Sequence, residues 1–240
     1  MKHRLNLRLL PALALLLVLS PALAQTERPN FAAADVRADL AYLAETLPLA
    51  HFNLYAYVGP PAFTQAYQVG LKSLSTDSVS RRQATLLFQR YAATANTGHC
   101  EVNFPVADYI AFARRGGTVF PLELAFEDGK VYIRRNFSGE ARAAAGAQVL
   151  SIDQVPIEQI RAGIHPYLSG ERPALKDAKL EFWSFPRLYW SVFGEKKAFE
   201  LKLKNAAGQL VQCRVSSIPV MEFEQQRGGE VLSAKRFFRY

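Results

Sequence analysis

Apolar side chains recur at helical spacing in the first third of the chain. Val36, Leu40, Leu43 and Leu47 are separated by four, three and four residues, which places them on one face of a helix. Asn30 precedes this pattern and is expected as its N-cap, and the helix is expected to end before Pro48.

Two more helices are predicted before residue 100. One begins at Pro60-Pro61, because proline is tolerated in a first helical turn, and the other is capped by Ser78 or Ser80 and ends before a break at Thr97-Gly98. Their apolar faces are formed by Phe63, Tyr67, Leu71 and Leu74 in the first and by Leu87, Tyr91 and Ala95 in the second. The sequence therefore predicts an N-terminal helical bundle.

From Thr118 the period shortens to that of strands. Residues 118–126 and 131–135 flank an Asp128-Gly129 pair, which favours a hairpin turn, and a second hairpin is predicted at 199–217. Between them we expect a short strand at 149–152, a turn, and a helix at 156–167. The aromatic stretch 182–193 fits either a buried helix interrupted at Pro186 or a surface that another part of the protein covers.

The first 24 residues have the three parts of a secretory signal peptide. Lys2, Arg4 and Arg8 precede an apolar run at 9–19, and Ala22-Leu23-Ala24 supplies a small-x-small cleavage site. The run is too short to span a bilayer, and no later stretch approaches 18 apolar residues. We therefore expect an exported, periplasmic or extracellular protein with no transmembrane span in its mature chain.

Composition and charge narrow the class further. Half of the 240 residues are hydrophobic and 21% are charged, as in globular proteins. The net charge of +8 falls to +5 without residues 1–24, because 26 basic and 21 acidic side chains remain. These charges are scattered rather than clustered, so a nucleic-acid partner is not expected.

The cysteines and histidines indicate no metal site. His51, His99 and His165 have no short ligand spacing among themselves or with Cys100 and Cys213, and nothing in the sequence requires a metal or another cofactor. The two cysteines are either a disulfide or, by default, two buried and inert thiols. Cys100 is a weak candidate for a nucleophile.

Four segments together resemble a known family. They are residues 51–57 (HFNLYAY), 95–100 (ANTGHC), 120–133 and 146–157 (GAQVLSIDQVPI). In order and spacing they are similar to the tail-specific, or C-terminal processing, serine peptidases, in the branch that looks like the catalytic core of tricorn protease.

The resemblance implies an α+β fold in which an N-terminal helical bundle precedes a PDZ-like mixed β domain. The expected divisions are the signal peptide at 1–24, the helical region at 25–104, the PDZ-like domain at 105–220 and a connection at 221–240. The crotonase-like domain that carries the nucleophilic serine in this family is expected to be absent, and the sequence has no Gly-x-Ser-x-Gly elbow.

Position by position, the family's general base falls on His99. An imidazole that titrates near neutral pH can take a proton from serine and return it to the leaving amine. The alternative is a structural histidine that follows a helix C-terminus.

A PDZ-like domain would bind a peptide or protein substrate, including its C-terminus. Arg115, Gly116, Gly117 and Thr118 are the candidate loop, because adjacent glycines let backbone N–H groups converge on a carboxylate. The same glycines also suit a plain linker.

The leading hypothesis is the N-terminal and substrate-recognition part of an exported serine-type peptidase, inactive by itself. A non-catalytic periplasmic peptide-binding adaptor is the alternative. A third hypothesis is an inert remnant whose aromatic surface at 182–193 lacks its partner domain. The sequence predicts no oligomeric state.

Overall fold

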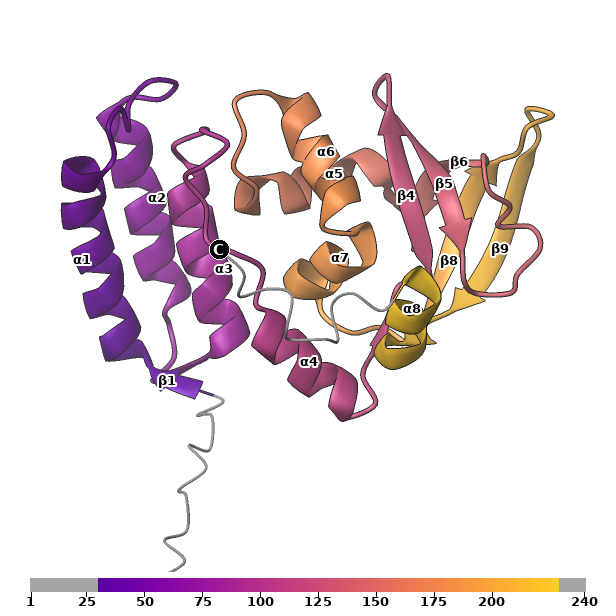
Figure 1. Cartoon of the computed structure of the whole chain (residues 1–240), viewed down its shortest axis with the longest axis horizontal. Coiled ribbons are helices and arrows are strands. Elements are labelled where there is room, and N and C mark those ends of the chain that lie inside the picture. The colour runs from indigo at the N-terminus through magenta and orange to yellow at the C-terminus, as the bar shows by residue number, and fades with distance from the viewer. Residues whose placement is uncertain (1–29, 229–240) are drawn as a thin grey trace, which may run out of the picture.

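Three helices pack side by side at one end of the molecule (Figure 1). The computed structural model describes residues 30–228, so the predicted signal peptide lies outside the described residues. The helices are α1 (Ala33–Ala50), α2 (Pro60–Ser73) and α3 (Arg81–Ala93). Their predicted apolar faces meet, with Leu40, Phe63 and Tyr91 buried in one core. The helical bundle is therefore confirmed.

The first helix differs from the prediction at both ends. Asn30 is not its cap but lies in β1 (Asn30–Ala32), which pairs antiparallel with β2 (Ser78–Ser80), and Ala32 takes the N-cap position. The helix also continues through Pro48 to Ala50. Because Pro48 lies in the last turn, it removes only one backbone hydrogen bond, and the break expected there was wrong.

The third helix begins as predicted. The Ser80 hydroxyl accepts a hydrogen bond from the backbone N–H of Gln83, and the Gln83 side chain accepts one from the backbone N–H of Ser80. This reciprocal capping box satisfies two of the donors that a helix start leaves without partners. Ser80, rather than Ser78, is the cap.

The second half of the chain is built on an antiparallel sheet with strand order β4-β5-β6-β8-β9. Its strands are β4 (Leu122–Glu127), β5 (Lys130–Asn136), β6 (Gln148–Ile152), β8 (Ala198–Lys204) and β9 (Leu210–Ser216), and β7 (Val155–Pro156) pairs with β6. Asp128 and Gly129 join β4 to β5 with φ of 48° and 74°, as a tight hairpin turn requires. Both predicted hairpins are confirmed.

Six helical segments accompany this sheet. They are α4 (Val106–Arg114), α5 (Ile157–Ile164), the 3-10 helix η1 (His165–Tyr167), α6 (Pro173–Phe182), α7 (Phe185–Phe193) and α8 (Val220–Arg227). The segment at 156–167 is confirmed as helical, whereas α4, α6 and α8 were not predicted. α8 occupies the start of the expected connection, and the rest of residues 221–240 lies mostly outside the described part.

The aromatic stretch at 182–193 is mostly a buried helix, as one of the two predicted alternatives had it, but the helix is not interrupted at Pro186. The chain breaks at Ser184, whose φ is 82°, and Pro186 then lies in the first turn of α7. Phe185 and Trp190 are buried, whereas Phe182 is 72% exposed. The helices α6 and α7 both pack on β4, so this protein itself covers most of the aromatic surface.

The structure holds two separate apolar cores. One is formed by the helical bundle and includes Cys100, and the other lies between the sheet and the later helices and includes Cys213. Both cysteines are free and buried, so the disulfide does not form and the alternative of two buried thiols is confirmed.

The observed fold class is α+β, whereas the assignment of the second half to a PDZ-like fold stays a prediction. No helix within residues 30–228 is long and apolar enough to cross a bilayer. β3 (Thr118–Val119) and β10 (Ile218–Pro219) form a separate antiparallel pair beside α8.

Candidate functional site

His99 lies in a tight turn that follows α3. The backbone N–H of Cys100 donates to the carbonyl of Thr97 at 3.2 Å, which closes the turn and leaves the His99 side chain exposed. Asn96, just before the turn, has a φ of 49°, a left-handed conformation that asparagine tolerates better than most residues. The turn thus presents the imidazole to solvent.

Side chains from the second half of the chain hold this turn in place. Glu171 accepts a hydrogen bond from the backbone N–H of Gly98 at 2.8 Å, and Lys179 donates to the carbonyl of Gly98 at 2.9 Å. The Ser169 hydroxyl donates to the carbonyl of Thr97. The residue before His99 therefore has both of its backbone polar groups fixed by the loop before α6 and by α6 itself.

The charges beside His99 are of both signs. The hydrogen bond from Gly98 is the main cause that lowers the pKa of the Glu171 carboxyl below its usual value, and the nearby His99 and Lys179 act in the same direction. Burial lowers the pKa of Lys176, which donates to the Asn96 side chain at 3.1 Å.

The structure gives the His99 ring no hydrogen-bond partner among residues 30–228. Ser169, a serine among the contacts that hold the turn, donates its hydroxyl to a backbone carbonyl and is fully buried. Burial, with a further contribution from Glu101, raises the pKa of the Cys100 thiol. A buried thiol with a raised pKa is a poor nucleophile, which agrees with the low weight given to Cys100.

A second histidine has an acidic partner that the sequence did not reveal. His165 Nε2 lies 2.9 Å from Asp177 Oδ1, and Arg161 Nε lies 3.1 Å from the same oxygen. Burial lowers the pKa of His165 more than Asp177 raises it. The two residues are twelve positions apart on η1 and α6, so only the packing of these elements brings them together, and no serine contacts the pair in the described part of the chain.

The four residues predicted to bind a carboxylate lie between α4 and β3. The backbone N–H groups of Arg115, Gly116 and Gly117 donate to carbonyls of α4, and the N–H and hydroxyl of Thr118 both donate to Glu195. All four backbone donors therefore have partners within the protein. The geometry lends no support to carboxylate capture here, and the assignment stays a prediction from the sequence.

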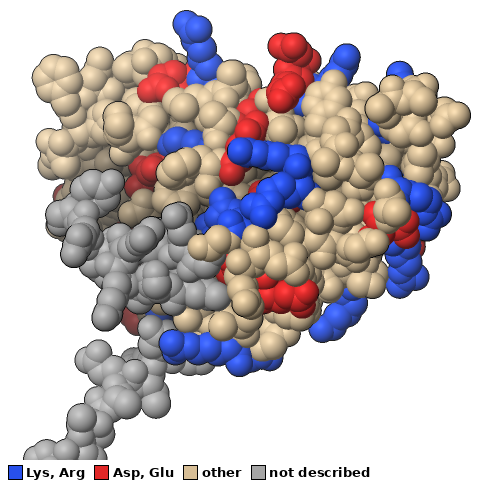
Figure 2. All heavy atoms as spheres, turned by 45° about the vertical axis from the view of Figure 1, so that its right-hand side comes forward, with Lys and Arg blue, Asp and Glu red and all other residues tan. Residues whose placement is uncertain are grey.

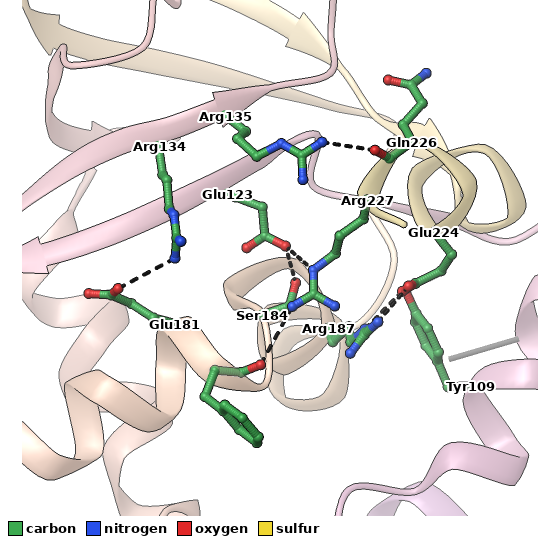
Figure 3. Close-up of polar contacts among 11 residues, drawn as sticks. Tyr109, Glu123, Arg134, Arg135, Glu181, Ser184, Arg187, Glu224, Gln226 and Arg227 are labelled. Atoms are coloured by element: carbon green, nitrogen blue, oxygen red, sulfur yellow. Dashed lines mark hydrogen bonds and ion pairs between the residues drawn. The ribbon is translucent and has the colours of Figure 1, made fainter. Parts of the chain in front are cut away.

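The most extensive polar network joins α8 to the second core (Figure 3). Glu224 of α8 accepts two hydrogen bonds from Arg187 of α7, at 2.8 and 2.5 Å, and one from the Tyr109 hydroxyl of α4 at 2.9 Å. Glu224 and Arg187 are 1% and 4% exposed. Burial is the main cause that raises the pKa of Tyr109, followed by the charge of Glu224.

A second group in Figure 3 lies beside the first. Glu123 of β4 accepts hydrogen bonds from Ser184 at 2.8 Å and from Arg227 at 2.7 Å. Together the two groups border a cavity of about 300 Å³ whose lining is almost entirely charged: Glu123, Arg134, Arg135, Glu181, Glu224, Arg227 and Gly228. The lining has three acidic and three basic side chains. Glu181 accepts a hydrogen bond from the backbone N–H of Phe126, which ties it to β4. The network positions α8 and holds no serine next to a histidine.

Charges elsewhere are mixed as well. On the face shown in Figure 2, basic and acidic side chains are interspersed rather than gathered by sign. No group of three or more His, Cys, Asp and Glu residues within 30–228 has the arrangement of a metal site.

Comparison with protein-family models and with curated proteins finds no match. Among solved structures, the chain is similar to CPAF, a chlamydial serine protease. It superposes on the crystal structure of a serine-to-alanine mutant of CPAF with 15% identity and a TM-score of 0.52, covering 78% of this chain and 34% of CPAF. Mature CPAF gives 16% identity, a TM-score of 0.51 and coverages of 77% and 34%.

Mature CPAF complexed with lactacystin gives 15% identity, a TM-score of 0.51 and coverages of 77% and 35%. The likeness shows that this chain shares part of the fold of CPAF, at low identity. The chain spans about a third of the length of these proteins.

Proposed function

We propose that this chain is the N-terminal and substrate-recognition part of a serine-type peptidase, in which His99 is the general base. The observation that carries the proposal is the construction of the His99 turn. Contacts from Ser169, Glu171 and Lys179 fix the backbone around His99, while the imidazole itself stays exposed. The fold shared with CPAF supports the proposal, and membership of the tail-specific family, in its tricorn-like branch, is part of it.

The chemistry needs one group that the described residues do not bring to His99. A serine hydroxyl from a further domain would lose its proton to the imidazole as its oxygen attacks the peptide carbonyl. The imidazolium would then donate that proton to the leaving amine. Glu171 would stabilise the intermediate cation, because its carboxylate lies near the ring and is held ionised by the hydrogen bond from Gly98.

Export is also part of the proposal. Residues 1–24 would direct the chain out of the cytoplasm and would be removed. N-terminal sequencing of the protein recovered from the periplasm or medium should begin at Gln25, and recovery of the intact N-terminus there would contradict this processing.

Reaction with a fluorophosphonate tests the catalytic proposal. Residues 25–240 alone should not react, because the structure brings no serine to the His99 ring among residues 30–228. A longer protein, in which the reading frame continues past Tyr240 into a serine-bearing domain, should react. In that protein, His99→Ala should abolish the labelling. His51→Ala is the matched control, since His51 is a second histidine of the helical bundle outside the His99 turn.

Two results would overturn the proposal. One is labelling of residues 25–240 alone, and the other is equal labelling of the His99→Ala and His51→Ala proteins. Preferential binding of peptides with free rather than amidated C-termini, without any labelling, would support the non-catalytic adaptor instead.

A further inference from the structure

α1 and the connection from α1 to α2 carry a set of exposed apolar side chains. Its members are large side chains that face solvent: Tyr42 at 70% exposure, Leu49 at 84%, Phe52 at 103%, Tyr55 at 42% and Tyr57 at 57%. We call these five residues the aromatic edge. Tyr42 and Leu49 are seven positions apart on α1, so they share one face of that helix.

Buried side chains of the same connection pack into the core of the bundle and support the aromatic edge. Leu54, in the middle of the connection, is 3% exposed and belongs to the core of the bundle. The ring of Tyr55 meets that of Phe63 edge to face, with centroids 5.6 Å apart. The exposed rings of this segment are therefore presented by a connection that has its own packing.

The segment is also without charge. No Asp, Glu, Lys or Arg lies between Glu45 and Lys72. Surfaces of soluble proteins seldom leave several large apolar side chains exposed together, and such patches mark sites of interaction.

The aromatic edge lies close to the His99 turn. The ring of Phe63 packs against both Tyr55 of the connection, with centroids 5.6 Å apart, and Tyr91 of α3, with centroids 5.8 Å apart. Figure 1 shows the connection from α1 to α2 and the loop after α3 at the same end of the bundle. The connection from α1 to α2 and the His99 turn thus lie at one end of the bundle.

We propose that the aromatic edge binds extended, apolar segments of the polypeptide substrate. This inference rests on the proposed function, since it assigns the substrate of the same site. With about 150–250 Å² for each aromatic side chain, the exposed area is roughly 600 Å². That is less than the ~800 Å² that each partner contributes to a standard protein interface, so the edge suits a short segment rather than a second copy of the chain.

Charge argues against a lipid surface as the occupant. Asp39 and Glu45 are exposed on α1 on either side of Tyr42 along the sequence. Their carboxylates would be repelled by anionic headgroups, whereas an apolar peptide segment carries no such charge.

The test uses a labelled peptide of about twelve residues with alternating Leu and Phe and with both ends capped, so that no terminal charge contributes. A peptide with Ser in place of Leu and Phe is its control. Fluorescence anisotropy with the mature chain should show binding of the apolar peptide only. Phe52→Ser combined with Tyr57→Ser should weaken that binding about tenfold, since two buried rings are lost.

Phe182→Ser is the control, because Phe182 is an aromatic residue outside the aromatic edge whose 72% exposure lies between the 57% of Tyr57 and the 103% of Phe52. It should change the affinity less than twofold. His99→Ala should also bind normally, so that a failure of catalysis and a failure of this inference give different results. Equal binding by the edge variant and the parent would overturn the inference, as would equal binding of the two peptides. Binding of neutral vesicles without binding of the apolar peptide would also overturn it and would assign the edge to lipid.

Discussion

Arg187 of α7 and Glu224 of α8 form a two-point ion pair that is almost entirely removed from solvent. The guanidinium group donates through Nε and Nη2 to the two carboxylate oxygens, and Tyr109 supplies a third hydrogen bond. The pair therefore fixes α8 against α7 and α4, at the end of the described part of the chain.

Removing one partner of this pair should strongly destabilise the fold. Glu224→Leu leaves the Arg187 guanidinium buried without a counter-charge, which should cost about 3–5 kcal/mol of unfolding free energy. Urea unfolding measures the loss. Adding Arg187→Met should restore much of it, because an apolar pair can fill the same space.

The exposed pair between Glu200 and Arg214 is the control for that experiment. Their side chains are 60% and 70% exposed and 3.7 Å apart. Glu200→Gln should therefore change the unfolding free energy by less than about 1 kcal/mol. An equal loss at the buried and exposed pairs would show that burial does not determine the cost.

Stability should fall in mild acid because of His165. Burial holds its pKa in the folded protein below the ordinary value of 6.5. As the pH falls through 6.5, the unfolded chain binds a proton that the folded chain does not, so the unfolding free energy decreases. Urea unfolding at pH 7.5 and 5.5 should show a smaller decrease for His165→Asn than for the parent. The same decrease in both proteins would assign the acid sensitivity to other groups.

Both thiols should be inaccessible in the native protein. Burial raises the pKa of Cys100 and of Cys213, and both side chains are covered. A thiol reagent at pH 7.5 should therefore react slowly with native protein and should titrate two thiols after denaturation. Fewer than two thiols in the denatured, unreduced protein would contradict the free state of both cysteines.

Gly117 should be required for packing. A Cβ atom at this position would lie 2.4 Å from the ring of Phe112, so Gly117→Ala should lower the melting temperature. Gly116→Ala meets open space but has a φ of +78°, and it should cost about 1 kcal/mol through backbone strain alone. In the Gly117→Ala background, Phe112→Leu should recover part of the loss. An unchanged melting temperature for Gly117→Ala would contradict the packing requirement at this position.

Local chemistry explains the elements that the sequence predicted correctly. The Ser80 cap depends on Gln83 only three residues away, and the turn at Asp128-Gly129 depends on two adjacent residues that accept positive φ. Prediction failed where the outcome depends on distant partners. Asn30 has the side chain of a cap, yet it lies in a strand because Ser80 pairs with it across fifty positions.

The candidate site was predictable only in part. The resemblance identified His99, but the residues that hold its turn come from 70 to 80 positions later in the chain. Glu123 and Arg227 are likewise 104 positions apart, and no sequence period links them. The Arg115–Thr118 loop shows the converse, since its glycines resemble a binding loop in sequence but donate their N–H groups within the protein.

The turn of His99 follows α3 in sequence. The side chains that form hydrogen bonds with its backbone come from the segment at 169–179, in the other half of the chain. A recombinant fragment that ended at the boundary predicted after residue 104 would keep the histidine and lose Glu171 and Lys179. Chimeras that exchange the helical bundle between related proteins should therefore carry residues 169–179 with it, since a bundle transferred alone would bring the imidazole without the framework that orients it.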